Sequence, residues 1–419
     1  MTVAPMLEAD GKHRSAFAVR LISWQKMYGR DDLPWQHCRD AYRVWLSEIM
    51  LQQTQVATVI PYYQRFLSRF PSLDRLAAAP LASVLEVWAG LGYYARARNL
   101  HRCAQRVVAE QGGSFPSEVA ELARLPGIGR STAGAIAVFA FARRAAILDG
   151  NVKRVLSRHF AIEATASATH DEQQLWALAE SLLPAIEIER YTQGLMDLGA
   201  TVCLRRAAQC DVCPLAGECL AQRSGRQNEL PTPRKRKPLP ERQATLVLLC
   251  CEQGVLFERR PPVGIWGGLL SLPELGDRRL TDFARQRDCS ILAMERLPTV
   301  KHTFTHFILN IDVVCAQVGH SAWRVAEASE IWLAYPEIAA AALPTPIRRL
   351  LQVAFPGRAQ AGPAGERSMR PIAQRPKATP PAKVTKPAVQ PTLPGPPQAS
   401  TATPKTTGPS RPPAKPTDE

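Results

Sequence analysis

The sequence predicts a multi-domain chain with a helical N-terminal part, an α+β part behind it and an unfolded tail. In residues 14–145, long stretches of 3.6-residue apolar spacing, interrupted by prolines, predict successive helices. From residue 244 onward, short apolar runs of strand length replace this pattern. In residues 357–419, Pro, Ala, Thr and Lys dominate and no aromatic residue occurs, so this segment cannot bury enough apolar surface to fold.

The charge of the chain predicts a polyanionic partner. The 419 residues include 52 Lys and Arg against 37 Asp and Glu, a net charge of +15. Such an excess fits nucleic acid or an anionic membrane surface. About half of it lies in residues 357–419, which we interpret as a solvated appendage or, second, as a non-specific attraction for DNA.

Membrane-spanning and secreted classes are not favoured. No apolar run approaches the length of a membrane span, and residues 1–12 lack the apolar core of a signal peptide. We therefore expect a cytoplasmic protein. In that reducing compartment, a group of cysteines points to a metal site rather than to disulfides.

The first expected helix contains Leu21, Trp24 and Tyr28 and ends at Gly29. The second is expected at residues 42–60.

The second helix carries a candidate acid, Glu48. Its neighbours on the helix surface are Val44, Trp45 and Leu51, all apolar. Apolar surroundings disfavour the charged carboxylate and raise its pKa, which suits a general acid near neutral pH. The alternative is a carboxylate that faces solvent.

Amide and aromatic side chains follow in two segments. Gln52 and Gln53 come about a turn after Glu48, and their amides can bond base edges or fill the gap left by a displaced base. After an expected helix at residues 81–89, residues 91–100 combine a glycine turn, Tyr93 and two arginines, a pattern that suits base stacking and phosphate contact. A tyrosine pair packed at a helix corner is an equal alternative.

Residues 125–134 predict a helix-hairpin-helix, a motif that holds the DNA backbone without reading its sequence. Gly127 and Gly129 bracket one aliphatic residue, so the backbone can turn sharply. A helix starts directly after them, and its free N–H groups suit a phosphate. Asp149 follows this helix and is placed either to cap the next one or to act on DNA.

Four cysteines with the spacing C-x6-C-x2-C-x5-C predict a metal centre, for which zinc and a four-iron cluster both satisfy the ligand count. They are Cys203, Cys210, Cys213 and Cys219. Arg205 and Arg206 lie in the first loop, where we expect them to contact DNA.

Beyond a basic, proline-rich linker, an α+β domain is expected. Residues 244–251 and 255–257 form an expected strand hairpin, residues 265–269 a loop, and residues 304–314 another strand region.

These segments together resemble the adenine DNA glycosylases of the MutY type over about residues 14–355. The resemblance implies a helical glycosylase core at 14–225, with a six-helix lobe at about 35–145 and a second lobe made of the N-terminal helix and 146–225. It further implies a [4Fe–4S] cluster on the four cysteines and a Nudix-like domain at 241–355. The basic linker is then 226–240 and the disordered tail 356–419.

The resemblance also implies an activity: removal of adenine from A:8-oxoguanine or A:G mispairs in duplex DNA. Glu48 then protonates adenine at N7, and Asp149 stabilises the positive charge on the sugar, with Asn151 in the polar network around it. The expected product is an abasic site. A monomer associated with a bacterial nucleoid is expected.

Further roles follow from matching positions. Ser131 stands where endonuclease III has a strand-cleaving lysine, and serine cannot form a Schiff base. Lys153 is the nearest candidate for incidental trapping. Gln52 fills the gap left in the duplex, Tyr93 is the wedge, and Gln53 lies on the DNA. Phe304, Thr305 and His306 stand where the family senses 8-oxoguanine, with threonine in place of the usual serine.

Three alternatives remain open. One is a bifunctional glycosylase and lyase like endonuclease III, and another is a non-catalytic iron–sulfur protein that binds DNA. The third is a Nudix-type pyrophosphohydrolase, although the chain lacks the Glu-rich helix that holds magnesium in such enzymes.

Overall fold

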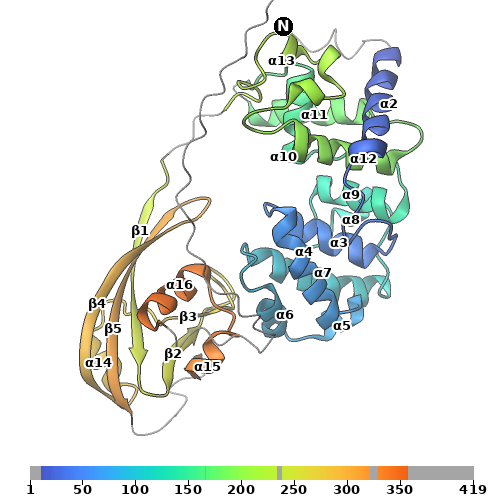
Figure 1. Cartoon of the computed structure of the whole chain (residues 1–419). Coiled ribbons are helices and arrows are strands. Elements are labelled where there is room, and N and C mark those ends of the chain that lie inside the picture. Colours follow the sequence, from blue (N-terminus) through green and yellow to red (C-terminus); the bar gives the residue numbers. More distant parts are fainter. Residues whose placement is uncertain (1–10, 166, 234–237, 321–328, 357–419) are drawn as a thin grey trace, which may run out of the picture. The chain divides into compact units, whose positions relative to one another are not determined.

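A computed structural model describes residues 11–165, 167–233, 238–320 and 329–356. The tail that the sequence predicts at 356–419 lies outside these residues except at its first position. The N-terminal part is helical, as predicted (Figure 1). Its helices are α2 (Gly11–Tyr28), α3 (Ala41–Leu51), α4 (Val56–Arg69), α5 (Leu73–Ala78), α6 (Leu81–Trp88), α7 (Ala95–Gln111), α8 (Val119–Leu122), α9 (Arg130–Phe141), α10 (Gly150–His159), α11 (Ala168–Ser181), α12 (Ile188–Asp197) and α13 (Leu220–Arg223).

The single helix expected at residues 42–60 is wrong: two helices, α3 and α4, occupy this stretch. The break falls at residues 52–55, where Gln53 has a left-handed backbone with φ 57°. A left-handed residue cannot continue a right-handed helix. The Gln52–Gln53 pair therefore lies in a loop, free of helical geometry.

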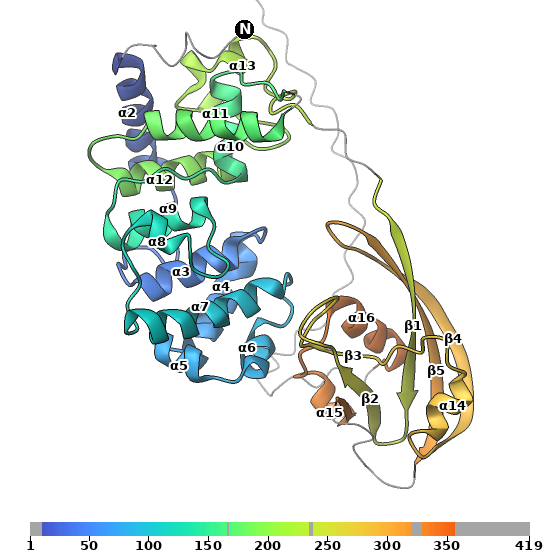
Figure 2. The same ribbon diagram turned by 180° about the vertical axis from the view of Figure 1, so that it is seen from behind.

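The helices pack around two hydrophobic cores. One contains α3 to α9, with Trp45, Phe66 and Trp88 fully buried. The other joins α2 to α10, α11 and α12, with Phe17 and Tyr191 at its centre. Figures 1 and 2 show α2, α10, α11, α12 and α13 gathered together. The N-terminal helix thus packs with segments far along the chain because its apolar face has no partner nearby in sequence.

The C-terminal part is a mixed sheet in the order β3-β2-β1-β5-β4, with β6 paired to β2. Its strands are β1 (Glu241–Cys250), β2 (Gly254–Arg259), β3 (Leu270–Ser271), β4 (Cys289–Thr303), β5 (Ile308–His320) and β6 (Glu330–Ala334). The predicted hairpin is confirmed, since β1 and β2 are antiparallel with Cys250 opposite Val255.

Each face of the sheet has its own core. One face packs α15 (Tyr335–Ile338) and α16 (Thr345–Ala354), and the other packs α14 (Leu280–Arg285). Residues 304–307, expected to begin a strand, instead form the turn between β4 and β5. The Phe304 N–H donates to the Phe307 carbonyl across this turn (2.8 Å).

Candidate active site

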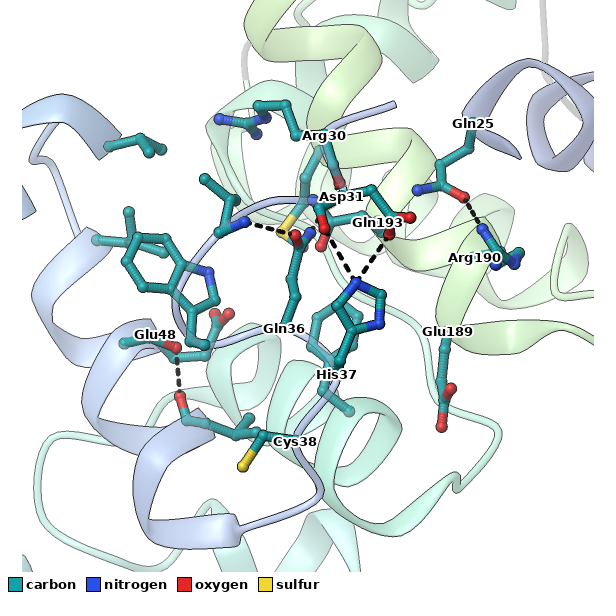
Figure 3. Close-up of a pocket in the computed structure, with 18 of the residues that line it drawn as sticks. Gln25, Arg30, Asp31, Gln36, His37, Cys38, Glu48, Glu189, Arg190 and Gln193 are labelled. Carbon is teal, nitrogen blue, oxygen red and sulfur yellow. Dashed lines mark hydrogen bonds and ion pairs between the residues drawn. The ribbon is translucent and has the colours of Figure 1, made fainter. Parts of the chain in front are cut away.

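A cavity of about 400 Å³ opens between α3 and α12. Trp35, Val44 and Leu51 supply apolar wall, and polar groups come from both helices and from the loop before α3 (Figure 3). The polar and charged lining residues are Gln25, Arg30, Asp31, Gln36, His37, Arg39, Ser47, Glu48, Glu189, Arg190 and Gln193. A half-open cavity with an apolar wall and polar groups opposite it suits a small flat heterocycle.

Glu48 lies in the wall of this cavity and is partly buried. Burial raises the pKa of its carboxyl to about 8, and the nearby charge of Asp149 adds to the rise. At neutral pH the acid is therefore protonated, as a proton donor must be.

Asp149 caps α10: its Oδ1 accepts from the Val152 N–H at 2.7 Å. Burial raises the pKa of Asp149, whereas backbone N–H groups and the charges of Lys153 and Arg154 oppose the rise. In the described part of the chain, the cavity lining does not include Asp149, so it reaches Glu48 from outside that wall.

Asn151 acts on Asp149 through its backbone, whose N–H bonds the carboxyl. Its side chain turns to Arg154, which donates to Oδ1 at 2.9 Å. Arg154 also donates to the carbonyls of Gly199 (2.6 Å) and Cys203 (2.8 Å). The sequence analysis missed Arg154, because nothing in one sequence shows that residues 151, 199 and 203 meet.

The hairpin has the predicted glycine turn, with α9 starting at Arg130. Gly127 has φ 79°, and a Cβ there would lie 2.8 Å from Asn99 Cβ, so glycine is required. Gly129 differs: its φ is −88° and a Cβ would meet nothing within 4 Å. The turn therefore does not require a glycine at position 129, and the open space beside it can admit a ligand. Ser131 Oγ accepts from the Leu148 N–H (3.0 Å).

The four predicted cysteines line one cavity beside α10. Burial raises the pKa of the Cys210, Cys213 and Cys219 thiols. Among the described residues, no three His, Cys, Asp or Glu side chains have the geometry of a single-ion site.

Arg158 is a second residue that the sequence analysis missed. It is buried, and its Nη1 donates to Cys203 Sγ (3.3 Å) and to the Leu204 carbonyl (2.7 Å). Its Nη2 donates to the carbonyl of Arg205 at 3.2 Å, while the side chains of Arg205 and Arg206 are exposed.

The predicted DNA contact Lys153 is engaged within the protein, since its Nζ forms an ion pair with Glu172 at 2.7 Å.

A second, larger groove brings other predicted residues together. Gln52, Gln53 and Tyr93 line it, and so do residues 302–307. Gln52 Nε2 donates to Thr132 Oγ1 (3.3 Å), and Tyr93 is 49% exposed with φ 50°. Thr305 Oγ1 lies 3.3 Å from His306 Nδ1.

Phe304 takes part in an aromatic group rather than standing alone. Its ring stacks on Phe307 at 4.5 Å and meets His302 edge-on at 4.6 Å. Phe307 is buried, so it belongs to the core, whereas Thr305 and His306 remain exposed. Trp266, which has φ 56°, completes the group; the sequence had placed it in the loop at residues 265–269, without a link to Phe304.

Comparison with known proteins identifies the family. Residues 46–181 match the HhH-GPD superfamily of base excision DNA repair proteins, and residues 244–353 match the NUDIX domain. The adenine DNA glycosylase of Buchnera aphidicola (subsp. Baizongia pistaciae) is 35% identical over 80% of this chain and 95% of its own length. This chain belongs to the adenine DNA glycosylase family.

The family extends to animals. Adenine DNA glycosylase of Homo sapiens is 34% identical over 81% of this chain and 74% of its own length. Among solved structures, a thermostable thymine-DNA glycosylase is 28% identical with a TM-score of 0.47, and the match covers 52% of this chain and all of that one. Within the described residues, no helix of this family member is long and apolar enough to cross a membrane.

Proposed function

We propose that this chain excises adenine from A:8-oxoguanine and A:G mispairs in duplex DNA and leaves an abasic site. Family membership supports adenine removal in base excision repair. The observation that carries the chemistry is that Glu48, in the wall of this cavity, has a pKa of about 8, raised by burial and by the charge of Asp149.

The reaction begins with extrusion of the adenine, since a stacked base cannot reach the cavity. Unstacking costs on the order of a few kcal/mol, which contacts to the opened duplex offset. The cavity then holds the heterocycle against the apolar wall made by Trp35, Val44 and Leu51. Excluding water from this space strengthens each polar contact.

Glu48 supplies the proton. When the bond between the sugar and the base breaks, the electron pair stays with adenine, which is a poor leaving group as an anion. Protonation by Glu48, at N7 as in this family, makes the leaving base neutral. Positive charge then builds on the sugar, as in glycoside hydrolysis, and a carboxylate close by lowers its energy.

Asp149 supplies the negative charge that stabilises the sugar. Two backbone N–H groups and the nearby cations favour its ionised form against the effect of burial. The same bonds fix its position at the start of α10. Water then adds to the sugar and its proton returns to the Glu48 carboxylate, which restores both groups.

The four cysteines fit an iron–sulfur cluster. Four thiols line one cavity, and the buried Arg158 cation donates to one sulfur, which suits the negative charge of thiolate ligands. Cys203, Cys210, Cys213 and Cys219 would hold a [4Fe–4S] cluster. When bound, it would brace the loop that presents Arg205 and Arg206 to the DNA backbone.

Ser131 supports a monofunctional enzyme. Its hydroxyl accepts from the backbone at the start of the segment that leads to Asp149, and it has no amine with which to form an imine. Magnesium-dependent hydrolysis by the C-terminal domain is not supported, because α14 carries only Asp282 as an acidic residue and Glu274 faces Arg260.

One assay tests the function. Purified full-length protein is incubated with a labelled A:8-oxoguanine duplex, and half of each sample is heated in alkali to cut at abasic sites. Product only after alkali supports the proposal. Cleavage without alkali at the rate of base loss would indicate a lyase, and binding without any product would indicate a DNA-binding protein.

A further inference from the structure

We propose that Arg96 is a positioning residue that holds Gln53 and Tyr93 in the backbone conformations with which they meet the opened duplex. This inference rests on the proposed function, because it concerns the two segments taken to contact DNA. Arg96 lies in the first turn of α7 and is only 9% exposed. Burying a cation is costly unless hydrogen bonds compensate it. Among the described residues the Nε of Arg96 has no partner, so its two terminal nitrogens make all of its hydrogen bonds.

One nitrogen of the guanidinium closes the end of the helix that carries Glu48. Nη1 of Arg96 donates hydrogen bonds to the carbonyls of Ile49 (2.9 Å) and Met50 (2.7 Å). These carbonyls belong to the last turn of α3, whose oxygens have no partner within the helix and carry the negative end of its dipole. Arg96 therefore stops α3 just before Gln52.

The other nitrogen reaches both loops. Nη2 of Arg96 donates to Thr54 Oγ1 at 3.0 Å, directly after Gln53. It also donates to the Gly92 carbonyl at 3.2 Å, directly before Tyr93. One planar group thus bonds to a neighbour of each DNA-facing residue.

The two residues so bracketed share an uncommon backbone. Gln53 has φ 57° and Tyr93 has φ 50°, although neither is glycine. Such conformations persist only where the surroundings over-determine them, and they gather at functional sites. The hydrogen bonds from Arg96 fix the backbone on one side of each residue.

An arginine is suited to this role and a lysine is not. The guanidinium holds its donors in a rigid fork, whereas an ammonium is a single point on a flexible stem. The cation also lies 5.4 Å from the ring centroids of Trp88 and Tyr93, so the wedge itself covers it. Burial lowers the pKa of Arg96 to about 10, which leaves it charged at neutral pH.

The test is a double-mutant cycle with Arg96→Lys and Tyr93→Ala. Single-turnover excision of adenine opposite 8-oxoguanine is measured for each variant and for the pair. If Arg96 acts through the wedge, Arg96→Lys slows excision by about 10- to 100-fold, because misplacement of about 1 Å is that costly. The double variant should then lose less than the product of the two single losses, since both changes remove the contribution of Tyr93 while Arg96→Lys also releases Gln53.

A second readout does not depend on excision. In a Glu48→Gln background, 2-aminopurine replaces the target adenine, and its fluorescence rises when it leaves the stack. Arg96→Lys is expected to lose most of this rise at saturating protein. Thr54→Val keeps the arginine but removes one acceptor, and we expect it to lose a smaller part.

Arg106→Lys is the matched control, because Arg106 lies on the same helix, is exposed and pairs with Glu110. It should match the wild type in both readouts. An undiminished fluorescence rise in Arg96→Lys, or losses that add in the cycle, would overturn the proposal. Failure of the wild type to excise adenine would instead count against the proposed function, and the fluorescence comparison would still judge the role of Arg96.

Discussion

The charge of Asp149 raises the pKa of Glu48, although the first residue precedes α10 and the second lies within α3. Two neighbouring carboxyls that influence each other favour one protonated and one ionised member. Burial raises the pKa of both, but the bonds and cations around Asp149 oppose its rise, whereas the pKa of Glu48 reaches about 8. We therefore assign the ionised role to Asp149 and the acid role to Glu48. The two proposed roles therefore follow from two different environments.

Replacing Glu48 by glutamine should abolish excision and spare binding. The amide has the size of the acid but has no proton to donate. We expect the single-turnover rate to fall at least about 100-fold, with the dissociation constant for the mispaired duplex within about threefold. Glu86→Gln, an exposed change on α6, is the control. Near-normal excision by Glu48→Gln would reject the assignment.

The excision rate should fall with rising pH. Because the pKa of Glu48 is about 8, the donor is protonated below that pH, and the rate is expected to level off there. Above pH 8 each further pH unit should lower the rate about tenfold. A profile under single-turnover conditions, with binding held saturating, checks this. A rate that rises through pH 8 would contradict an acid role.

The Glu48→Gln variant should be more stable to unfolding than the wild type near pH 7. In the unfolded chain Glu48 ionises near the ordinary glutamate pKa of 4.5, whereas in the folded protein it stays protonated up to about pH 8. Stability is thus lost between these values, and glutamine avoids the loss. The gain should be about 3 kcal/mol at pH 7. Denaturant unfolding should show no gain at pH 4, and a gain there would refute this explanation.

Asp149→Asn should separate capping from catalysis. Asparagine also accepts from the Val152 N–H, so α10 stays capped, but the negative charge is gone. We expect unchanged thermal stability with excision reduced about 100-fold or more. Asp149→Ala should lose excision and also stability, with the lost helix cap costing about 1 kcal/mol of unfolding free energy. If Asp149→Asn keeps full activity, the residue is a cap alone.

Thr305→Ala and His306→Ala should narrow the preference for adenine opposite 8-oxoguanine over adenine opposite guanine. Both side chains are exposed at the turn between β4 and β5 and contact each other. The ratio of the two excision rates should fall several-fold, on the order of 1 kcal/mol for one lost polar contact. Gln317→Ala, exposed on β5, is the control. Equal ratios in all variants would place lesion sensing elsewhere.

Local patterns predicted much of this fold. The glycine turn before α9, the first helix ending at Gly29 and the β1–β2 hairpin depend on short-range periodicity and turn chemistry, and each is found as predicted. The continuous helix at 42–60 is wrong, because the chain breaks at Gln53, whose left-handed backbone no apolar spacing predicts. The strand expected from residue 304 is wrong at its start, because a run of aromatics fits a turn or a strand equally well.

By itself, the sequence determined which chemical groups this protein has: an acid among apolar neighbours, an aspartate at a helix start, a glycine turn before a helix and four spaced cysteines. These are local facts, fixed by the order of residues within one or two helical turns. Only the tertiary structure decided that Glu48 is enclosed and within range of Asp149. It also placed the buried Arg96 and Arg158 and the half-buried Arg154 as cations that join distant segments. Such contacts arise when separate apolar faces pack together, and no spacing within one strand or helix encodes which residues will then meet.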